Sequence, residues 1–106
     1  MAEKKTRKKE LKGTMYDVSI KLISTRGNCP NGHKIGDQWI CTSKTPEGMC
    51  ANAFHAFFDT IWALHLGVKL PFLEGHDGIL LACPDPHVQN VFEVKRAKKA
   101  PLVAHS

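Results

Sequence analysis

Residues 49–66 read MCANAFHAFFDTIWALHL, and this stretch decides the fold class. Large apolar side chains recur in it at intervals of three and four residues, which is the spacing of one face of an α-helix. We expect five of them to form the stripe that packs on the rest of the protein: Phe54, Phe57, Phe58, Ile61 and Leu64. Thr45 and Pro46 are typical of a helix start, and Gly67 is typical of a helix stop.

Strand patterns lie on both sides of this predicted helix. Before it, residues 15–25 alternate apolar and polar side chains, and residues 37–42 form a shorter strand. After it, residues 79–83 are wholly apolar and predict a buried strand, and residues 91–95 predict a last strand that pairs antiparallel with it. The order β-β-α-β-β predicts an α+β fold in a single small domain, with one helix packed on a small, mainly antiparallel sheet.

The two ends of the chain carry its net charge of +5. Six basic residues lie within 1–12 and four within 95–106, whereas the middle contains more acidic than basic residues. A chain of 106 residues accommodates one domain. We expect residues 1–14 to be a disordered basic tail, 15–97 the single α+β domain and 98–106 a flexible basic tail. Such tails bind nucleic acid weakly and without sequence preference.

The sequence also indicates the compartment. No apolar run approaches the roughly 20 residues that cross a bilayer, and the polar, basic start of the chain carries no secretory signal. We therefore expect a cytoplasmic protein without membrane contact. Cysteines in the cytoplasm are kept reduced, so the four cysteines predict ligands or packing residues rather than a disulfide framework.

Three of the cysteines lie at the ends of predicted elements, where functional side chains are often placed: Cys29, Cys50 and Cys83. Cys41 lies inside a strand, and we expect it to be a small core residue. Cys29 and His33 share one short loop, so a sulfur and a nitrogen could bind the same metal ion. The pattern predicts a metal site formed by Cys29, His33, Cys50 and Cys83.

His55 is a further candidate, as a ligand or as a neighbour of the site. On a regular helix Cys50 and His55 point roughly 140° apart, so both reach one centre only if Cys50 precedes the regular helix. Asp59 shares a helix face with His55 and could hold its imidazole ring by the second nitrogen. The other histidines have no neighbouring ligand pattern, and we expect them at the surface: His65, His76, His87 and His105.

The predicted topology separates Cys29 from the other two cysteines. If the first two strands form a simple hairpin, Cys29 and Cys50 lie at opposite ends of the sheet, roughly 17–20 Å apart. Cys50 and Cys83, in contrast, are expected to lie near each other. Cys29 joins them only if the loop 26–36 folds back, and its eleven residues are long enough for that.

Three blocks of the sequence resemble those of a family of short, uncharacterised prokaryotic proteins. They are Cys-x3-His-Lys-x-Gly-Asp at 29–37, Thr-Pro-Glu-Gly-x-Cys-x3-Phe-His-Ala at 45–56 and Ala-Cys-Pro-Asp-Pro at 82–86. The resemblance covers about 16–96 and implies that five residues form one functional unit: Cys29, His33, Cys50, His55 and Cys83. It implies no particular reaction, and the lysine-rich N-terminal extension departs from the family's pattern.

The metal of the predicted site is either zinc or an iron–sulfur cluster, because both favour thiolate ligands. The sequence has no Cys-x-x-Cys pair, which is the strongest mark of structural zinc, and this slightly favours a cluster. Three cysteines leave one iron of a cluster open to a substrate or to histidine, whereas one zinc ion with three cysteines and His33 would form a closed, structural site.

Two other classes of function stay open. One is a metal-free thiol enzyme, in which the helix N-terminus stabilises the Cys50 thiolate, His33 or His55 is the base and Cys83 is a resolving thiol. The other is a nucleic-acid or protein binding module that acts through the basic termini. Exposed strand edges would also allow a homodimer.

Overall fold

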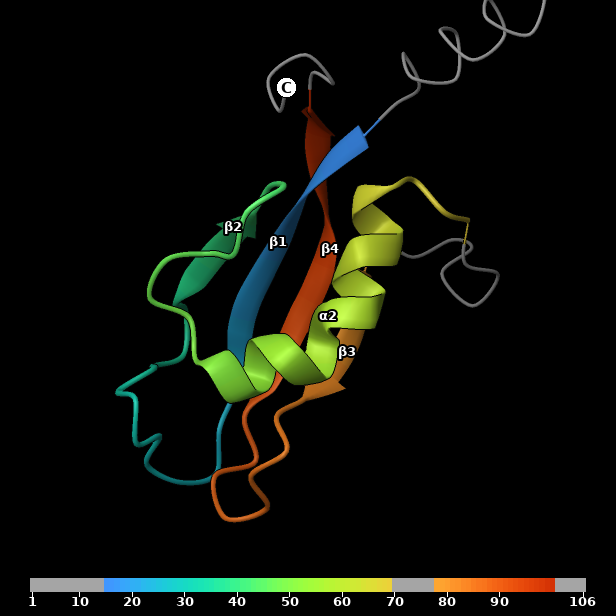
Figure 1. The fold of residues 1–106 in the computed structure, drawn as a ribbon. Coiled ribbons are helices and arrows are strands. Elements are labelled where there is room, and N and C mark those ends of the chain that lie inside the picture. Colours follow the sequence, from blue (N-terminus) through green and yellow to red (C-terminus); the bar gives the residue numbers. More distant parts are fainter. Residues whose placement is uncertain (1–14, 70–77, 101–106) are drawn as a thin grey trace, which may run out of the picture.

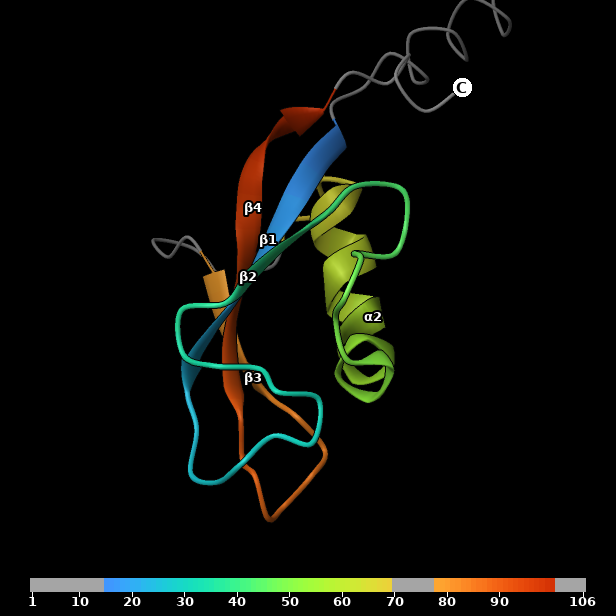
Figure 2. The ribbon, with the colours of Figure 1, turned by 90° about the vertical axis from the view of Figure 1, so that its left-hand side faces the viewer.

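The computed structural model describes residues 15–69 and 78–100. They form a single α+β domain in which one helix covers one face of a four-stranded antiparallel sheet, as the sequence predicts (Figures 1 and 2). The elements follow in the predicted β-β-α-β-β order: β1 (Met15–Ser24), β2 (Gln38–Cys41), α2 (Ala51–His65), β3 (Gly78–Ala82) and β4 (Val91–Ala100).

The sheet has the order β2-β1-β4-β3, with the two ten-residue strands at its centre. β4 is longer than the predicted strand 91–95, because it pairs with β1 along its whole length, from Val91 opposite Ser24 to Ala100 opposite Met15. The last strand therefore includes residues 98–100, which we expected in the C-terminal tail.

β3 pairs antiparallel with β4, as predicted. Its expected burial is wrong, because β3 is the edge strand of the sheet and the helix covers only one of its faces. The side chain of Leu80 is 60% exposed on the open face. A continuous apolar run therefore does not distinguish a central strand from an edge strand here.

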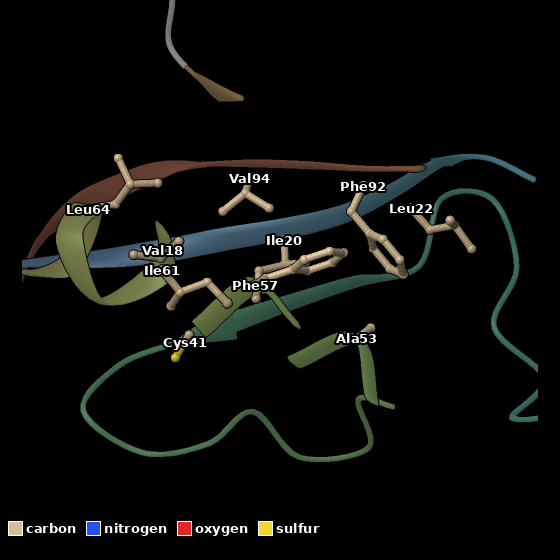
Figure 3. Close-up of a cluster of buried hydrophobic side chains, with 10 residues drawn as sticks. All are labelled: Val18, Ile20, Leu22, Cys41, Ala53, Phe57, Ile61, Leu64, Phe92 and Val94. Carbon is tan, nitrogen blue, oxygen red and sulfur yellow. The ribbon is translucent and has the colours of Figure 1, made fainter. Parts of the chain in front are cut away.

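The core lies between the sheet and the helix (Figure 3). Its buried side chains come from the inward faces of β1, β2, β4 and α2: Val18, Ile20, Leu22, Cys41, Ala53, Phe57, Ile61, Leu64, Phe92 and Val94. Of the predicted helix stripe, Phe58 is wrongly assigned and is 42% exposed. Successive helical residues turn by about 100°, so Phe58 leaves the buried line of Phe57 and stacks on Trp62 instead.

The helix starts close to the predicted beginning of its helical pattern at Met49, but later than the start signal at Thr45 and Pro46. Cys50 is the N-cap residue, whereas Thr45 and Pro46 lie in the preceding irregular segment. Gly48 has a φ of 81°, a left-handed conformation that interrupts a right-handed helix, and it separates the predicted start from the observed one. At the other end, Gly67 has a φ of 78° and follows the last turn, as predicted.

The surface assignment of His65 is also wrong. Its side chain is fully buried, because it lies one helical turn after Ile61 on the buried face of α2. Nδ1–H donates a hydrogen bond of 2.7 Å to the carbonyl oxygen of Tyr16 on β1. His87 is exposed, as expected. His76 and His105 lie outside the described residues.

Within residues 15–69 and 78–100, no helix is long and apolar enough to span a bilayer.

Candidate metal centre

Three segments meet at one end of the sheet (Figures 1 and 2). They are the loop 25–37 between β1 and β2, the start of α2, and the turn 83–90 between β3 and β4. The antiparallel pairing of β1 with β4 brings the loop and the turn together, since Ser24 at the end of β1 lies opposite Val91 at the start of β4. Cys29, Cys50 and Cys83 belong to these three segments.

The segment 42–50 removes the expected separation of Cys29 from Cys50. β2 does run away from the loop 25–37 along the middle of β1, as far as Cys41 opposite Val18. The chain then runs back past the side of the sheet before α2 begins (Figure 1). The return brings the backbone N–H of Cys50 to His33 in the first loop, at 3.0 Å. The loop 26–36 and the segment 42–50 thus meet at His33 and Cys50.

The loop 25–37 is also bound to the turn 83–90. Arg26 donates a backbone hydrogen bond of 2.9 Å to the carbonyl oxygen of Val88, and its guanidinium donates one of 2.7 Å to the side chain of Gln89. A Cβ atom on Gly27 would lie 2.9 Å from the carbonyl oxygen of His87, so only glycine fits this approach without a shift. These contacts position Cys29 beside the turn that carries Cys83.

A pocket of about 190 Å³ lies where the three segments meet. Its lining includes all four residues of the predicted metal site: Cys29, His33, Cys50 and Cys83. The three cysteines are free thiols and each is half-buried. The remaining walls are partly apolar, from Ala53, Val88 and Phe92, and partly polar, from Asp85 and Asn90. The topology thus gathers at one pocket the residues that the sequence placed at the ends of different elements.

The pocket is not a preformed coordination sphere. Among residues 15–69 and 78–100, no three Cys, His, Asp or Glu side chains lie close enough together to hold a metal ion. The donor set nevertheless fits a soft metal, because thiols dominate it. The loop with Cys29 contains neither helix nor strand, and a turn holds it at this point, since the Cys29 carbonyl oxygen accepts the backbone N–H of Gly32 at 2.9 Å.

His33 has a structural partner in this arrangement. Its Nε2 accepts the backbone N–H of Cys50 at 3.0 Å. The edge of the ring contacts Trp39, with 4.6 Å between ring centroids. His33 therefore satisfies a backbone donor at the helix start, and its Nε2 lone pair points at that donor rather than at the thiols.

His55 and Asp59 are not brought to the pocket. Both are exposed on α2, and neither lines the pocket wall. Cys50 does precede the regular helix, which was the condition for pairing it with His55. The second helical turn nevertheless carries His55 to the solvent side.

The turn 83–90 supplies two polar residues of the pocket wall that we did not predict as site residues, Asp85 and Asn90. Asp85 folds the turn, since its Oδ1 accepts the backbone N–H of His87 at 2.9 Å and its carbonyl oxygen accepts that of Gln89 at 3.0 Å. Asp85 lies two residues after Cys83, and this short spacing could have indicated that it belongs to the same pocket. Asn90 had no such signal, because it is buried only when the turn closes. A hydrogen bond from the Cys83 N–H to the Asn90 carbonyl oxygen closes the turn.

Cys41 lies in the core, as predicted, and does not line the pocket. Burial raises the pKa of its thiol above the ordinary value of 9.0, and the Asp17 carboxylate adds to the rise. Cys41 is therefore an internal control for any chemistry at the other three cysteines.

Comparisons with known proteins found no matching family model, no matching curated protein and no matching solved structure.

Proposed function

We propose that this protein binds a soft metal centre through Cys29, Cys50 and Cys83. The observation that supports it is the convergence of three free, half-buried thiols, from three separate segments, on one pocket. A single cysteine is often only a small buried side chain. Three such residues around one pocket, with the fourth cysteine packed in the core, are the arrangement that thiolate ligation needs.

His33 is not a preferred fourth ligand in this proposal, because its Nε2 already accepts the Cys50 N–H. A centre with three thiolates keeps one position open, which is typical of catalytic zinc and of clusters that bind an external ligand. Zinc would act there as a Lewis acid and a cluster as an electron carrier or substrate ligand. We favour a cluster, since the sequence lacks paired cysteines and the pocket is far larger than one ion.

The direct test is the metal and acid-labile sulfide content of protein purified without oxygen, together with its visible spectrum. Iron with sulfide and a brown colour would establish a cluster, and stoichiometric zinc without colour would establish a zinc site. Either signal should be lost in Cys29→Ser, Cys50→Ser and Cys83→Ser and kept in Cys41→Ser. Folded wild-type protein that contains neither metal would contradict the proposal.

A metal-free thiol enzyme is the second candidate, and the position of Cys50 favours it. Cys50 is the N-cap residue of a fifteen-residue helix with no acidic residue in its first turn, and it lines the pocket. The thiol-enzyme hypothesis predicts that Cys50 is alkylated much faster than Cys29 and Cys83 in metal-free protein. Four free thiols fit the cytoplasmic, reducing location that we propose for both functions.

A further inference from the structure

The side of α2 that lies opposite the core carries a second row of side chains (Figure 2). At about 100° per residue, six exposed positions fall within one sector of roughly 100° on the helix surface. We call this set the outer face of α2, and it consists of Ala51, His55, Phe58, Asp59, Trp62 and Leu66. Phe58, Trp62 and Leu66 are each at least 40% exposed.

The composition of the outer face is unusual for a helix surface in water. α2 has one formally charged residue in fifteen, Asp59, although charged residues make up 24% of the chain. The exposed side of a helix normally carries its charged side chains, and a helix that is apolar all round is normally covered all round. Contiguous exposed apolar side chains mark interaction sites. The outer face therefore has the composition of an interface.

The aromatic side chains of the outer face are already ordered. Phe58 stacks on Trp62 with 5.8 Å between ring centroids, and an edge contact of 5.9 Å with Phe54 continues the row toward the helix start. Side chains that their neighbours hold in place lose less conformational freedom when a partner binds. Since an aromatic side chain has roughly 150–250 Å² of surface, Phe58 and Trp62 each leave on the order of 60–100 Å² for a partner to cover.

The charges of α2 define the class of partner. Helices that bind anionic lipid or nucleic acid carry Lys and Arg on their exposed side, and α2 contains neither. Its outer face instead presents a base, His55, and an acid, Asp59, beside the aromatic pair. A surface that carries both members of a complementary pair matches a second copy of itself, which is the requirement of an interface with two-fold symmetry.

We propose that two copies of this chain associate through the outer faces of α2, packed antiparallel about a two-fold axis. An axis midway between His55 and Asp59 places His55 of each copy opposite Asp59 of the other. It also brings the two Phe58 side chains together and sets each Trp62 against the small Ala51 of the other copy. Antiparallel packing is favourable for the helix dipoles as well. No outer-face residue lines the pocket, so this inference is independent of the metal centre.

Sedimentation equilibrium of the full-length chain, as purified, measures this association. The outer face spans only about 22 Å, so we expect a small interface with a dissociation constant in the micromolar range. Phe58→Glu and Trp62→Glu should each weaken the association at least tenfold, because both place a charge in a shared apolar contact. Leu80→Glu is the matched control, since Leu80 is 60% exposed on the open face of the sheet, and it should leave the association unchanged.

A charge exchange tests the antiparallel geometry. His55→Glu sets two carboxylates against each other across the axis, and Asp59→Lys sets two bases against each other, so each variant alone should associate more weakly than the wild type. An equimolar mixture of the two should recover the association, because opposite charges then meet. Both positions are exposed, so neither substitution disturbs the core.

Three results would overturn the proposal. The first is a wild-type chain that stays monomeric at about 1 mM, which is the result expected if a different protein covers the outer face. The second is a dimer that survives Phe58→Glu and Trp62→Glu, since the contact then lies elsewhere, for example at a strand edge. The third is a mixture of the two charge variants that associates no better than either variant alone.

Discussion

At the scale of single residues, His33 shows how a predicted ligand becomes a structural group. Its Nε2 accepts the Cys50 N–H at 3.0 Å, and its ring packs against Trp39. We expect His33→Ala to lower the free energy of unfolding by about 1–2 kcal/mol, because it removes a hydrogen bond and an aromatic contact. Urea unfolding of metal-depleted protein measures this change without a contribution from the metal.

The same variant separates capping from ligation. If His33 only holds the helix start, His33→Ala keeps the metal stoichiometry of the wild type. Loss of metal at unchanged stability of the depleted protein would show instead that His33 is a ligand.

Cys41 gives a prediction about pH. Burial, and then the Asp17 carboxylate, raise the pKa of its thiol in the folded state above the ordinary 9.0. The folded protein therefore favours the neutral thiol, and this contribution to stability is present below about pH 9 and lost as the pH rises further. We expect the difference in free energy of unfolding between wild type and Cys41→Ala to be constant below about pH 8 and to shrink above pH 9. A difference that stays constant throughout this range would contradict the assignment.

At the scale of elements, Arg96 on β4 secures the end of α2. Its Nε donates to the carbonyl oxygen of Leu64 at 2.9 Å, a second guanidinium nitrogen donates to that of Val68, and the guanidinium lies 5.1 Å from the Tyr16 ring centroid. Carbonyl groups at a helix end have no partner within the helix, so a cation there is favourable.

We expect Arg96→Ala to lower the free energy of unfolding by about 1–2 kcal/mol, as measured with urea. Lys95→Ala is the matched control on the neighbouring position. Lys95 makes an exposed ion pair of 3.8 Å with Glu93, so its loss should change stability by less than about 1 kcal/mol. Equal effects of the two substitutions would show that Arg96 does not secure the helix.

The elements were predictable to the extent that their pattern is local. The period of 49–66 and the alternation in 15–25 correctly predict α2 and β1, although β1 is buried on both faces from Asp17 to Ile20. The helical pattern from Met49 agrees with the observed start at Ala51, whereas the left-handed Gly48 separates the Thr45 and Pro46 signal from the helix. The burial of β3 was missed because strand order, which no local pattern contains, makes it an edge.

At the scale of the whole molecule, the grouping of the cysteines was predictable, but the contacts that produce it were not. Three cysteines at element ends were sufficient to suggest one pocket, and the structure gathers them there. The return of 42–50 and the binding of Arg26 to the turn 83–90 are long-range contacts, so the sequence could not supply them. His65 was misplaced for a similar reason, since its partner is a backbone carbonyl on β1.

The basic ends predict a separable property. Residues 1–12 lie outside the described residues and carry most of the N-terminal charge. We expect any binding to a mixed-sequence DNA duplex to weaken steeply with added salt and to disappear when residues 1–12 are deleted, while Cys→Ser changes leave it intact. Fluorescence anisotropy measures it. Affinity that survives the deletion would instead indicate binding by the folded domain.

The central claim is that Cys29, Cys50 and Cys83 act together on one metal centre. Site-resolved alkylation with iodoacetamide, followed by mass spectrometry before and after chelation of anaerobically purified protein, tests it most directly. We predict that these three thiols are slow together before chelation and fast together after the metal is removed. Cys41 should stay slow in both states, because it is buried with a raised pKa. Alkylation rates of Cys29, Cys50 and Cys83 that differ from one another and do not change on chelation would contradict this claim.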